Sequence, residues 1–237
     1  MRIPGMYCGV ALVCVLMLLM SAGCTTDQQQ GGVSPPLSSE EGTNAPVSDT
    51  EAPVTMVSPT PEGVLSPEET ADLLFMQEEE RLARDVYAVF YETWNMQVFE
   101  NIGDAEQSHT DSVAVLVRRY GLDDDSAEVV AGVFTNPELQ KLYDDLVLAG
   151  MQSPEDALRA AALVEETDIV DLQDAMSRTE NADILRVYEN LMAGSENHLR
   201  SFVKNLEQRG ASYTPVVLTQ EEYDAIISAS GSPGGAP

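Results

Sequence analysis

VFENIGDAEQSHTDSVAVLVRRYG, residues 98–121, predicts a long amphipathic helix that carries charged groups on its apolar face. At 100° per residue, one stripe of this segment collects the apolar side chains Phe99, Ile102, Val113, Leu116 and Val117. Glu106 and His109 fall in the same stripe, where a carboxylate and an imidazole are costly to bury unless they are paired or bind a cation. Gly121 marks the end of the helix. We therefore predict a helix from about Val98 to Tyr120 that carries Glu106-x-x-His109 into a protein core.

Further helix signals recur throughout residues 64–229. Ser66 and Ser153 each offer an N-cap hydroxyl followed by a proline, and Glu69 completes a capping box at Ser66. Other predicted helices cover 137–150, about 181–207 and a short segment after Thr219. The two middle long helices are joined by about 30 residues that include the 137–150 helix. The sequence thus predicts an all-α, ferritin-like four-helix bundle, with a short helix in its long crossover and a short C-terminal helix.

Every predicted long helix has a polar residue near the middle of its apolar face, and the chain's two histidines both point inward. This arrangement is similar to that of dimetal four-helix bundles, in which each helix pair supplies one glutamate and one Glu-x-x-His. Ser195 stands three residues before His198, so one carboxylate of that pattern is missing. The same groups could instead form a buried hydrogen-bonded network without metal. The candidate metal ligands are Glu79, Glu106, His109, Glu165 and His198, with Glu80, Asp168 and Ser195 as secondary candidates.

Five segments resemble an uncharacterised ferritin-like family of prokaryotes, known as a domain-of-unknown-function family. They are FMQEEERLARDVYAVFYETW, NIGDAEQSHTDSVAVLVRRYGL, GVFTNPELQKLYDDLV, DALRAAALVEETDIVDLQDA and VYENLMAGSENHLRSFVKNLE. The resemblance covers roughly residues 65–229. It implies a ferritin-like bundle with a di-iron or di-manganese site, and it supplies no activity. A looser similarity of ERLARDVY to rubrerythrin-type proteins would make Glu80 the first-helix ligand, whereas periodicity favours Glu79.

Residues 1–24 are typical of a signal peptide that ends in a lipid anchor. The apolar run of 11 residues from Val10 to Met20 is shorter than the roughly 20 residues of a membrane span. SAGC then places Cys24 as in a lipobox, although Ser21 stands where an aliphatic residue is usual. A lipidated Cys24 would hold the protein on the outer face of the cell membrane. Ordinary signal cleavage and an uncleaved short anchor are the alternatives.

The composition of the flanking segments and the overall charge narrow the possible functions. Residues 25–63 and 230–237 are rich in small and polar residues, which predicts a disordered tether and tail around the 64–229 helical domain. A formal net charge of −28 argues against nucleic-acid binding. The cysteines are confined to the first 24 residues, so thiolate-held zinc and iron–sulfur sites are excluded from the helical domain.

Three hypotheses follow from these observations. In the first, two iron or manganese ions serve iron, oxygen or peroxide handling, with no organic cofactor. In the second, the bundle is an envelope-anchored binding module, and in the third it is a structural module without metal. The sequence does not decide whether the protein is an enzyme or whether it forms a homodimer, and it does not identify a protein partner.

Overall fold

The computed structural model describes residues 64–122 and 130–229, which form six α-helices and no β-strand. The all-α prediction is confirmed for this part of the chain. The signal peptide with Cys24, the tether and the C-terminal tail lie outside the described residues. None of the helices within the described ranges combines the length and the hydrophobicity needed to cross a membrane. The helices are α1 (Pro67–Trp94), α2 (Gln97–Arg119), α3 (Pro137–Gly150), α4 (Pro154–Ser177), α5 (Ala182–Gln208) and α6 (Gln220–Ser228).

Local side-chain chemistry sets the helix ends. The Ser66 hydroxyl accepts the Glu69 N–H at 3.0 Å, and the Glu69 carboxylate accepts the Ser66 N–H at 2.8 Å, which forms the predicted capping box. At the other end of α1, Asn95 adopts a left-handed conformation with φ of 50°. Asparagine tolerates this region better than most residues, so the chain can turn directly from α1 into α2.

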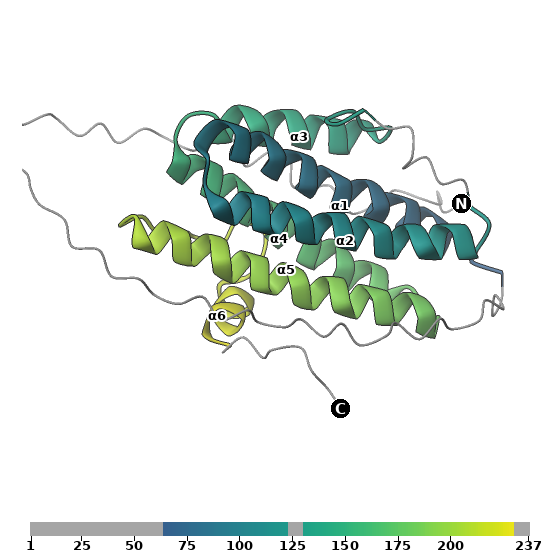
Figure 1. Cartoon of the computed structure of the whole chain (residues 1–237). Helices are drawn as coiled ribbons and strands as arrows, with labels where there is room; N and C mark the ends of the chain where they lie inside the picture. The colour runs from purple at the N-terminus through teal and green to yellow at the C-terminus, as the bar shows by residue number, and fades with distance from the viewer. Residues whose placement is uncertain (1–63, 123–129, 230–237) are drawn as a thin grey trace, which may run out of the picture. The chain divides into compact units, whose positions relative to one another are not determined.

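The four long helices pack as a bundle of two hairpins, α1–α2 and α4–α5 (Figure 1). Asp72 pairs with Arg178, and Tyr87 contacts Glu165, so α1 and α4 run antiparallel. Since α1 is also antiparallel to α2, helices α2 and α4 run parallel, and their connection must return along the bundle. Helix α3 lies in this connection, packed on α1 and α4. The predicted crossover with a short helix is therefore present.

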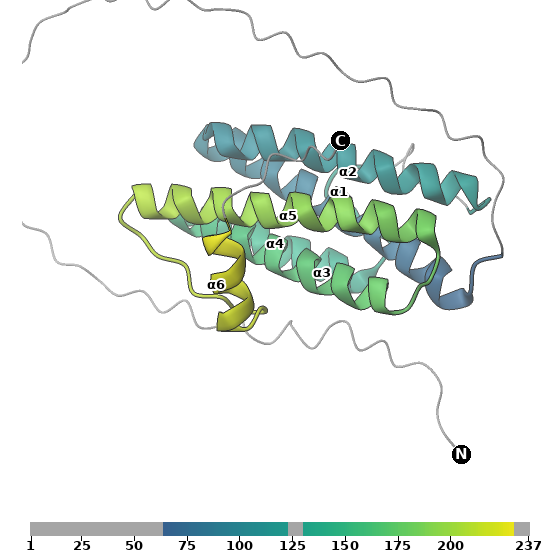
Figure 2. The ribbon, with the colours of Figure 1, turned by 90° about the horizontal axis from the view of Figure 1, so that it is seen from below.

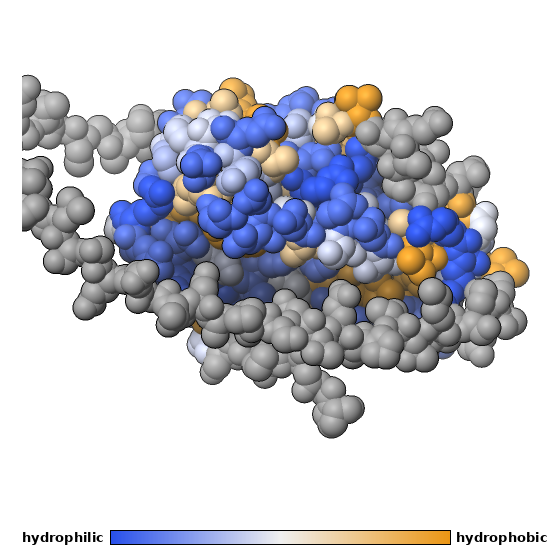
Figure 3. All heavy atoms as spheres, in the orientation of Figure 1, coloured by the Kyte–Doolittle hydropathy of each residue, from blue (hydrophilic) through white to orange (hydrophobic). Residues whose placement is uncertain are grey.

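Helix α6 and the segment before it pack across the bundle. Figure 2 shows α6 running across α5 instead of along it. The buried Glu166 of α4 holds this segment, because its Oε2 accepts the backbone N–H groups of Val216, Val217 and Leu218 at 2.8, 2.6 and 3.2 Å. On the face seen in Figure 3, the surface over α1, α2 and α3 is mostly hydrophilic, with small hydrophobic spots.

The hydrophobic core is divided into two clusters, one toward each end of the bundle. One cluster surrounds the aromatic residues Tyr87, Phe90, Phe99 and Phe202. The other includes Leu73, Met76, Val113, Leu172 and Leu191. Along each long helix, the residues between these clusters are the inward polar ones that the sequence singles out. The fold thus places a polar centre between two apolar layers that shield it from water at both ends.

Candidate metal centre

Eight polar side chains from the four long helices meet between the apolar clusters. Seven of the residues are at most 9% exposed, and only His109 is half-buried. Burying this many ionisable groups is costly without mutual pairing or a bound cation. The residues are Glu79 and Glu80 on α1, Glu106 and His109 on α2, Glu165 and Asp168 on α4, and Ser195 and His198 on α5.

Glu106 lies between the two histidines. Its Oε2 is 2.8 Å from His109 Nδ1, and its Oε1 is 2.7 Å from His198 Nδ1. The second pair approaches without hydrogen-bond geometry, so neither Oε1 nor His198 Nδ1 has a hydrogen-bond partner among the described residues. The imidazole rings stack with their centroids 5.5 Å apart. One ligand atom from each residue lies within 4.8 Å of the others, so these three residues could hold a metal ion.

Each histidine has a second carboxylate beside it. Glu80 Oε2 is 3.2 Å from His109 Nδ1, and Glu165 Oε2 is 3.6 Å from His198 Nδ1. The hydroxyl of Tyr87 donates a hydrogen bond to the other oxygen of Glu165 and fixes its orientation. The centre therefore contains two similar groups, each made of one histidine and one glutamate, with Glu106 between them.

The contacts of Glu79 and Glu80 differ although both side chains are buried. Adjacent residues on a helix point about 100° apart. Glu80 faces His109, whereas the Glu79 carboxyl is hydrogen-bonded to Asp171 of α4. Periodicity favours Glu79 as the first-helix ligand, but the structure brings Glu80 to the histidines.

Asp168 lies beside the position of the missing carboxylate. The Ser195 hydroxyl donates to Asp168 Oδ2 and also to the Leu191 carbonyl. Asp168 Oδ1 has no hydrogen-bond partner within residues 64–122 and 130–229. A carboxylate from α4 thus stands next to Ser195, where the dimetal pattern would place one from α5. The sequence already indicated this position, because the spacing Glu165-x-x-Asp168 places both carboxylates on the same face of α4.

The histidines and Glu106 shift one another's pKa values in opposite directions. Burial lowers the pKa of His109, but its contacts with Glu106 and Glu80 outweigh burial and raise it to about 11. The same balance, with Glu165 and Glu106 as partners, raises the pKa of His198 to about 10. Burial raises the pKa of Glu106, but the two histidines lower it to about 2. Without metal, Glu106 is therefore a carboxylate between two imidazolium groups.

The remaining carboxyl groups have raised pKa values, so they keep their protons to a higher pH than ordinary carboxyl groups do. Burial is the main cause, and it raises the pKa of both Glu165 and Asp168 to about 7. The charge of Glu106 adds to this effect at both residues. Burial and the charge of Asp168 also raise the pKa of Glu80 well above its usual value. A bound cation can take the place of these protons, which is how ionisable metal ligands behave.

Comparison with known proteins places the chain in a family. Residues 69–230 match the family described as "Uncharacterized protein domain (DUF2202)". The chain belongs to this family. It is 45% identical over 178 residues to "Uncharacterized protein MJ0754" of Methanocaldococcus jannaschii, covering 75% of this chain and 96% of that protein. This chain is also similar to a solved structure, "Crystal structure of hypothetical protein MJ0754 from Methanococcus jannaschii DSM 2661". The two structures match with a TM-score of 0.71 and 45% sequence identity, over 74% of this chain and 100% of that chain.

The DUF2202 domain also uses a glycine that the sequence interpretation missed. A Cβ atom on Gly194 of α5 would lie 2.5 Å from His109 Cε1 and 2.6 Å from His109 Nε2. The absence of a side chain at this position lets the imidazole pack directly against α5. Glycine inside a helix costs about 1 kcal/mol relative to alanine. A glycine in the middle of a predicted helix therefore indicates that a side chain would not fit there, and this was the signal in the sequence.

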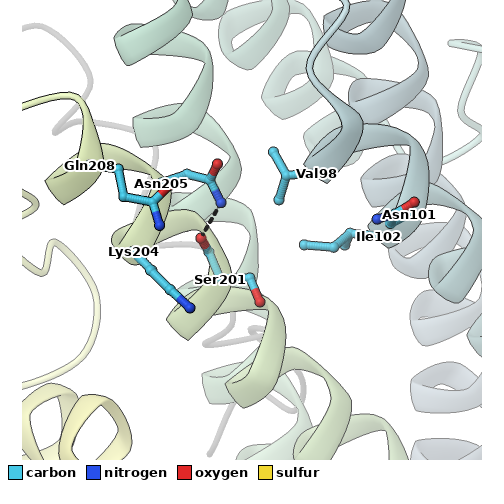
Figure 4. Close-up of a pocket in the computed structure, with 7 residues that line it drawn as sticks. All are labelled: Val98, Asn101, Ile102, Ser201, Lys204, Asn205 and Gln208. Atoms are coloured by element: carbon cyan, nitrogen blue, oxygen red, sulfur yellow. Dashed lines mark hydrogen bonds between the residues drawn. The ribbon is translucent and has the colours of Figure 1, made fainter. Parts of the chain in front are cut away.

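A groove on the α2–α5 face of the DUF2202 domain begins next to the centre. It has a volume of about 380 Å³ and is lined by Val98, Asn101, Ile102, Ser201, Lys204, Asn205 and Gln208 (Figure 4). Ile102 is one turn before Glu106, and Ser201 is one turn after His198. The side chains of His109 and His198 are 16% and 11% exposed, so the centre is partly open to solvent.

Proposed function

We propose that this domain is a ferritin-like metalloprotein. It binds two iron or manganese ions and handles iron, oxygen or peroxide outside the cell membrane. The observation that carries this proposal is Glu106, a fully buried carboxylate whose two oxygens face the Nδ1 atoms of two histidines. The parallel α2 and α4, with α3 in the crossover between them, support the ferritin-like arrangement.

The donor set fits two divalent ions. His109 and Glu80 would hold one ion, His198 and Glu165 the other, and Glu106 would contact both. Asp168 supplies a fourth carboxylate, so two divalent charges would balance four carboxylates while both imidazoles stay neutral. Carboxylate oxygen and imidazole nitrogen are ligands that suit iron and manganese. Four buried atoms of this donor set have no hydrogen-bond partner among the described residues, and a metal would satisfy them. They are Glu80 Oε1, Glu106 Oε1, Asp168 Oδ1 and His198 Nδ1.

Other residues would position these ligands. Tyr87 and Ser195 hold Glu165 and Asp168 by hydrogen bonds, as outer partners of metal ligands do. The two apolar clusters exclude water at both ends, while the exposed edges of the histidines leave access from the α2–α5 face. When bound, iron or manganese would supply electron exchange with oxygen or peroxide.

The location of the domain is part of the same proposal. The apolar run before Cys24 and the polar segment 25–63 support a lipoprotein whose domain is tethered to the outer face of the cell membrane. A second candidate function, a metal-free binding or structural module, draws support from the 2.8 Å contact between Glu106 and His109. That contact pairs two buried charges without any metal.

Metal binding separates the two candidates. Chain purified without a histidine tag should contain iron or manganese, and metal-free protein should gain about 2.7 kcal/mol of stability at a metal concentration one hundred times the Kd. His198→Ala should lose most of this gain, and Fe(II) oxidation by oxygen should depend on the same residue. Identical melting curves with metal and with chelator would support the metal-free candidate instead.

A further inference from the structure

A second carboxyl pair lies on the α1–α4 side of the centre, away from the histidines. Glu79 is 3% exposed, and its carboxyl group is hydrogen-bonded to that of the half-buried Asp171. The Oε2 atom of Glu79 has no hydrogen-bond partner in the described part of the chain. A buried carboxyl oxygen without a partner costs free energy that an apolar residue such as leucine at this position would avoid.

These carboxyl groups form a row from the surface to the centre, in which each group interacts electrostatically with the next. Asp174 is exposed at the outer end, and Asp171 follows one turn earlier on the same helix. The Glu79 carboxyl lies close to those of Asp171 and Asp168, and also close to the candidate ligand Glu80. The row thus connects solvent with the two carboxylates that stand beside His109 and Ser195.

The positive charge near the outer end is already paired. Arg178 makes two hydrogen bonds to Asp72, at 3.0 and 2.9 Å, and its side chain is 44% exposed. The ion pair bridges α1 and α4 at the surface, beside Asp171. Arg178 is thus paired with Asp72, although Glu79 is more deeply buried than Asp72.

We propose that Glu79 and Asp171 form an outer binding site for a divalent cation, through which metal moves between solvent and the centre. The inference rests on the proposed function, because it requires a metal at the centre. A cation at this site satisfies the unpartnered Glu79 Oε2 and lies one side chain away from both Glu80 and Asp168. Because Glu79 faces away from the histidines, it contributes to the rate of metal transfer and not to the final coordination.

The kinetics of metal loading test this inference directly. Co(II) serves as the probe, since its visible absorption reports coordination by nitrogen and oxygen. Stopped-flow mixing gives the rate of uptake, competition with a chelator gives the rate of release, and an equilibrium titration gives the Kd. Glu79→Gln and Asp171→Asn preserve side-chain size and remove charge. Each should slow uptake about tenfold, the scale of rate effects that fixed charges near a site produce. A site on the path slows release by the same factor, so the Kd should stay unchanged.

Glu189→Gln is the matched control, because it removes one negative charge from an exposed position on α5 that lies outside this row of carboxyl groups. Its rates should stay close to those of the unaltered protein. Slowed uptake and release in both inner variants, with an unchanged Kd, supports the outer site. A weaker Kd with unchanged uptake would overturn it and make Glu79 part of the centre. Unchanged rates and Kd would leave the proposed function intact and overturn only this inference. If the unaltered protein binds no cobalt at all, both proposals fail.

Discussion

Replacing Gly194 with alanine tests whether close packing against α5 fixes His109. The new Cβ would lie 2.5 and 2.6 Å from two atoms of the imidazole ring, closer than carbon atoms can approach without displacement. Gly103 of α2 is a matched control in the same bundle. A Cβ there would meet Tyr87 Cβ at 3.7 Å and the Arg84 carbonyl at 4.0 Å, which are ordinary contacts.

The two substitutions should change stability in different directions. Each replaces a helix-interior glycine, which by itself gains about 1 kcal/mol in the free energy of unfolding. At Gly194, overpacking costs about 1–3 kcal/mol, because the ring cannot move freely while His109 Nδ1 lies 2.8 Å from Glu106 and 3.2 Å from Glu80. We therefore expect a gain of about 1 kcal/mol for Gly103→Ala. For Gly194→Ala we expect a net change between about zero and a loss of 2 kcal/mol.

The same displacement should weaken metal binding. Disturbing the support of a metal ligand typically costs about 10–100-fold in affinity. Thermal melts with and without metal, together with Co(II) titrations, measure both effects in both variants. If Gly194→Ala is as stable as Gly103→Ala and binds metal like the unaltered protein, the argument that Gly194 fixes His109 is refuted.

Three further predictions concern pH, the C-terminal segment and anchoring. The folded pKa values of about 7 for Glu165 and Asp168 exceed the unfolded carboxyl value, and that of about 10 for His198 exceeds the unfolded histidine value. Folding therefore takes up protons, so stability of the metal-free protein is highest near pH 5 and falls toward pH 8, as melts in chelator should show. Glu166→Ala removes the acceptor of three backbone amides and should cost about 1–3 kcal/mol in denaturant unfolding, with faster hydrogen exchange in the segment before α6. Cys24→Ser should release the protein from membranes or block its maturation, and unchanged fractionation would count against lipidation.

The helices could be predicted from the sequence because their ends depend on local chemistry. The capping box of Ser66 and Glu69 and the N-cap of Ser153 involve residues three apart, so the sequence contains the whole interaction. Apolar periodicity then identified the buried face of each helix. The inward position of Glu106 and the two histidines follows from the same pattern, because they lie in line with the apolar side chains.

Contacts between helices were harder to predict. Glu79 and Glu80 are both buried, and a small rotation of α1 decides which of them meets His109. That rotation depends on how α1 packs against α2 and α4, and periodicity within α1 carries no information about it. The pairing of Ser195 with Asp168 joins two helices across 27 residues. For the same reason, sequence spacing alone suggested a missing carboxylate, although the structure has one beside Ser195.

Charge balance explains how this centre can be buried in more than one state. Without metal, the centre holds two imidazolium groups and the Glu106 carboxylate, and partial ionisation of Glu165 and Asp168, whose pKa values are about 7, offsets the remaining positive charge. With two divalent ions, four carboxylates are balanced and both imidazoles are neutral. In passing from the first state to the second, the metal ions replace the protons on the histidines and carboxyl groups. Metal binding must therefore release protons and become stronger as the pH rises. The stability of the metal-free fold changes in the opposite direction over the same pH range. A metal-free network would lose stability toward pH 8 in the same way, but added metal would restore none of it.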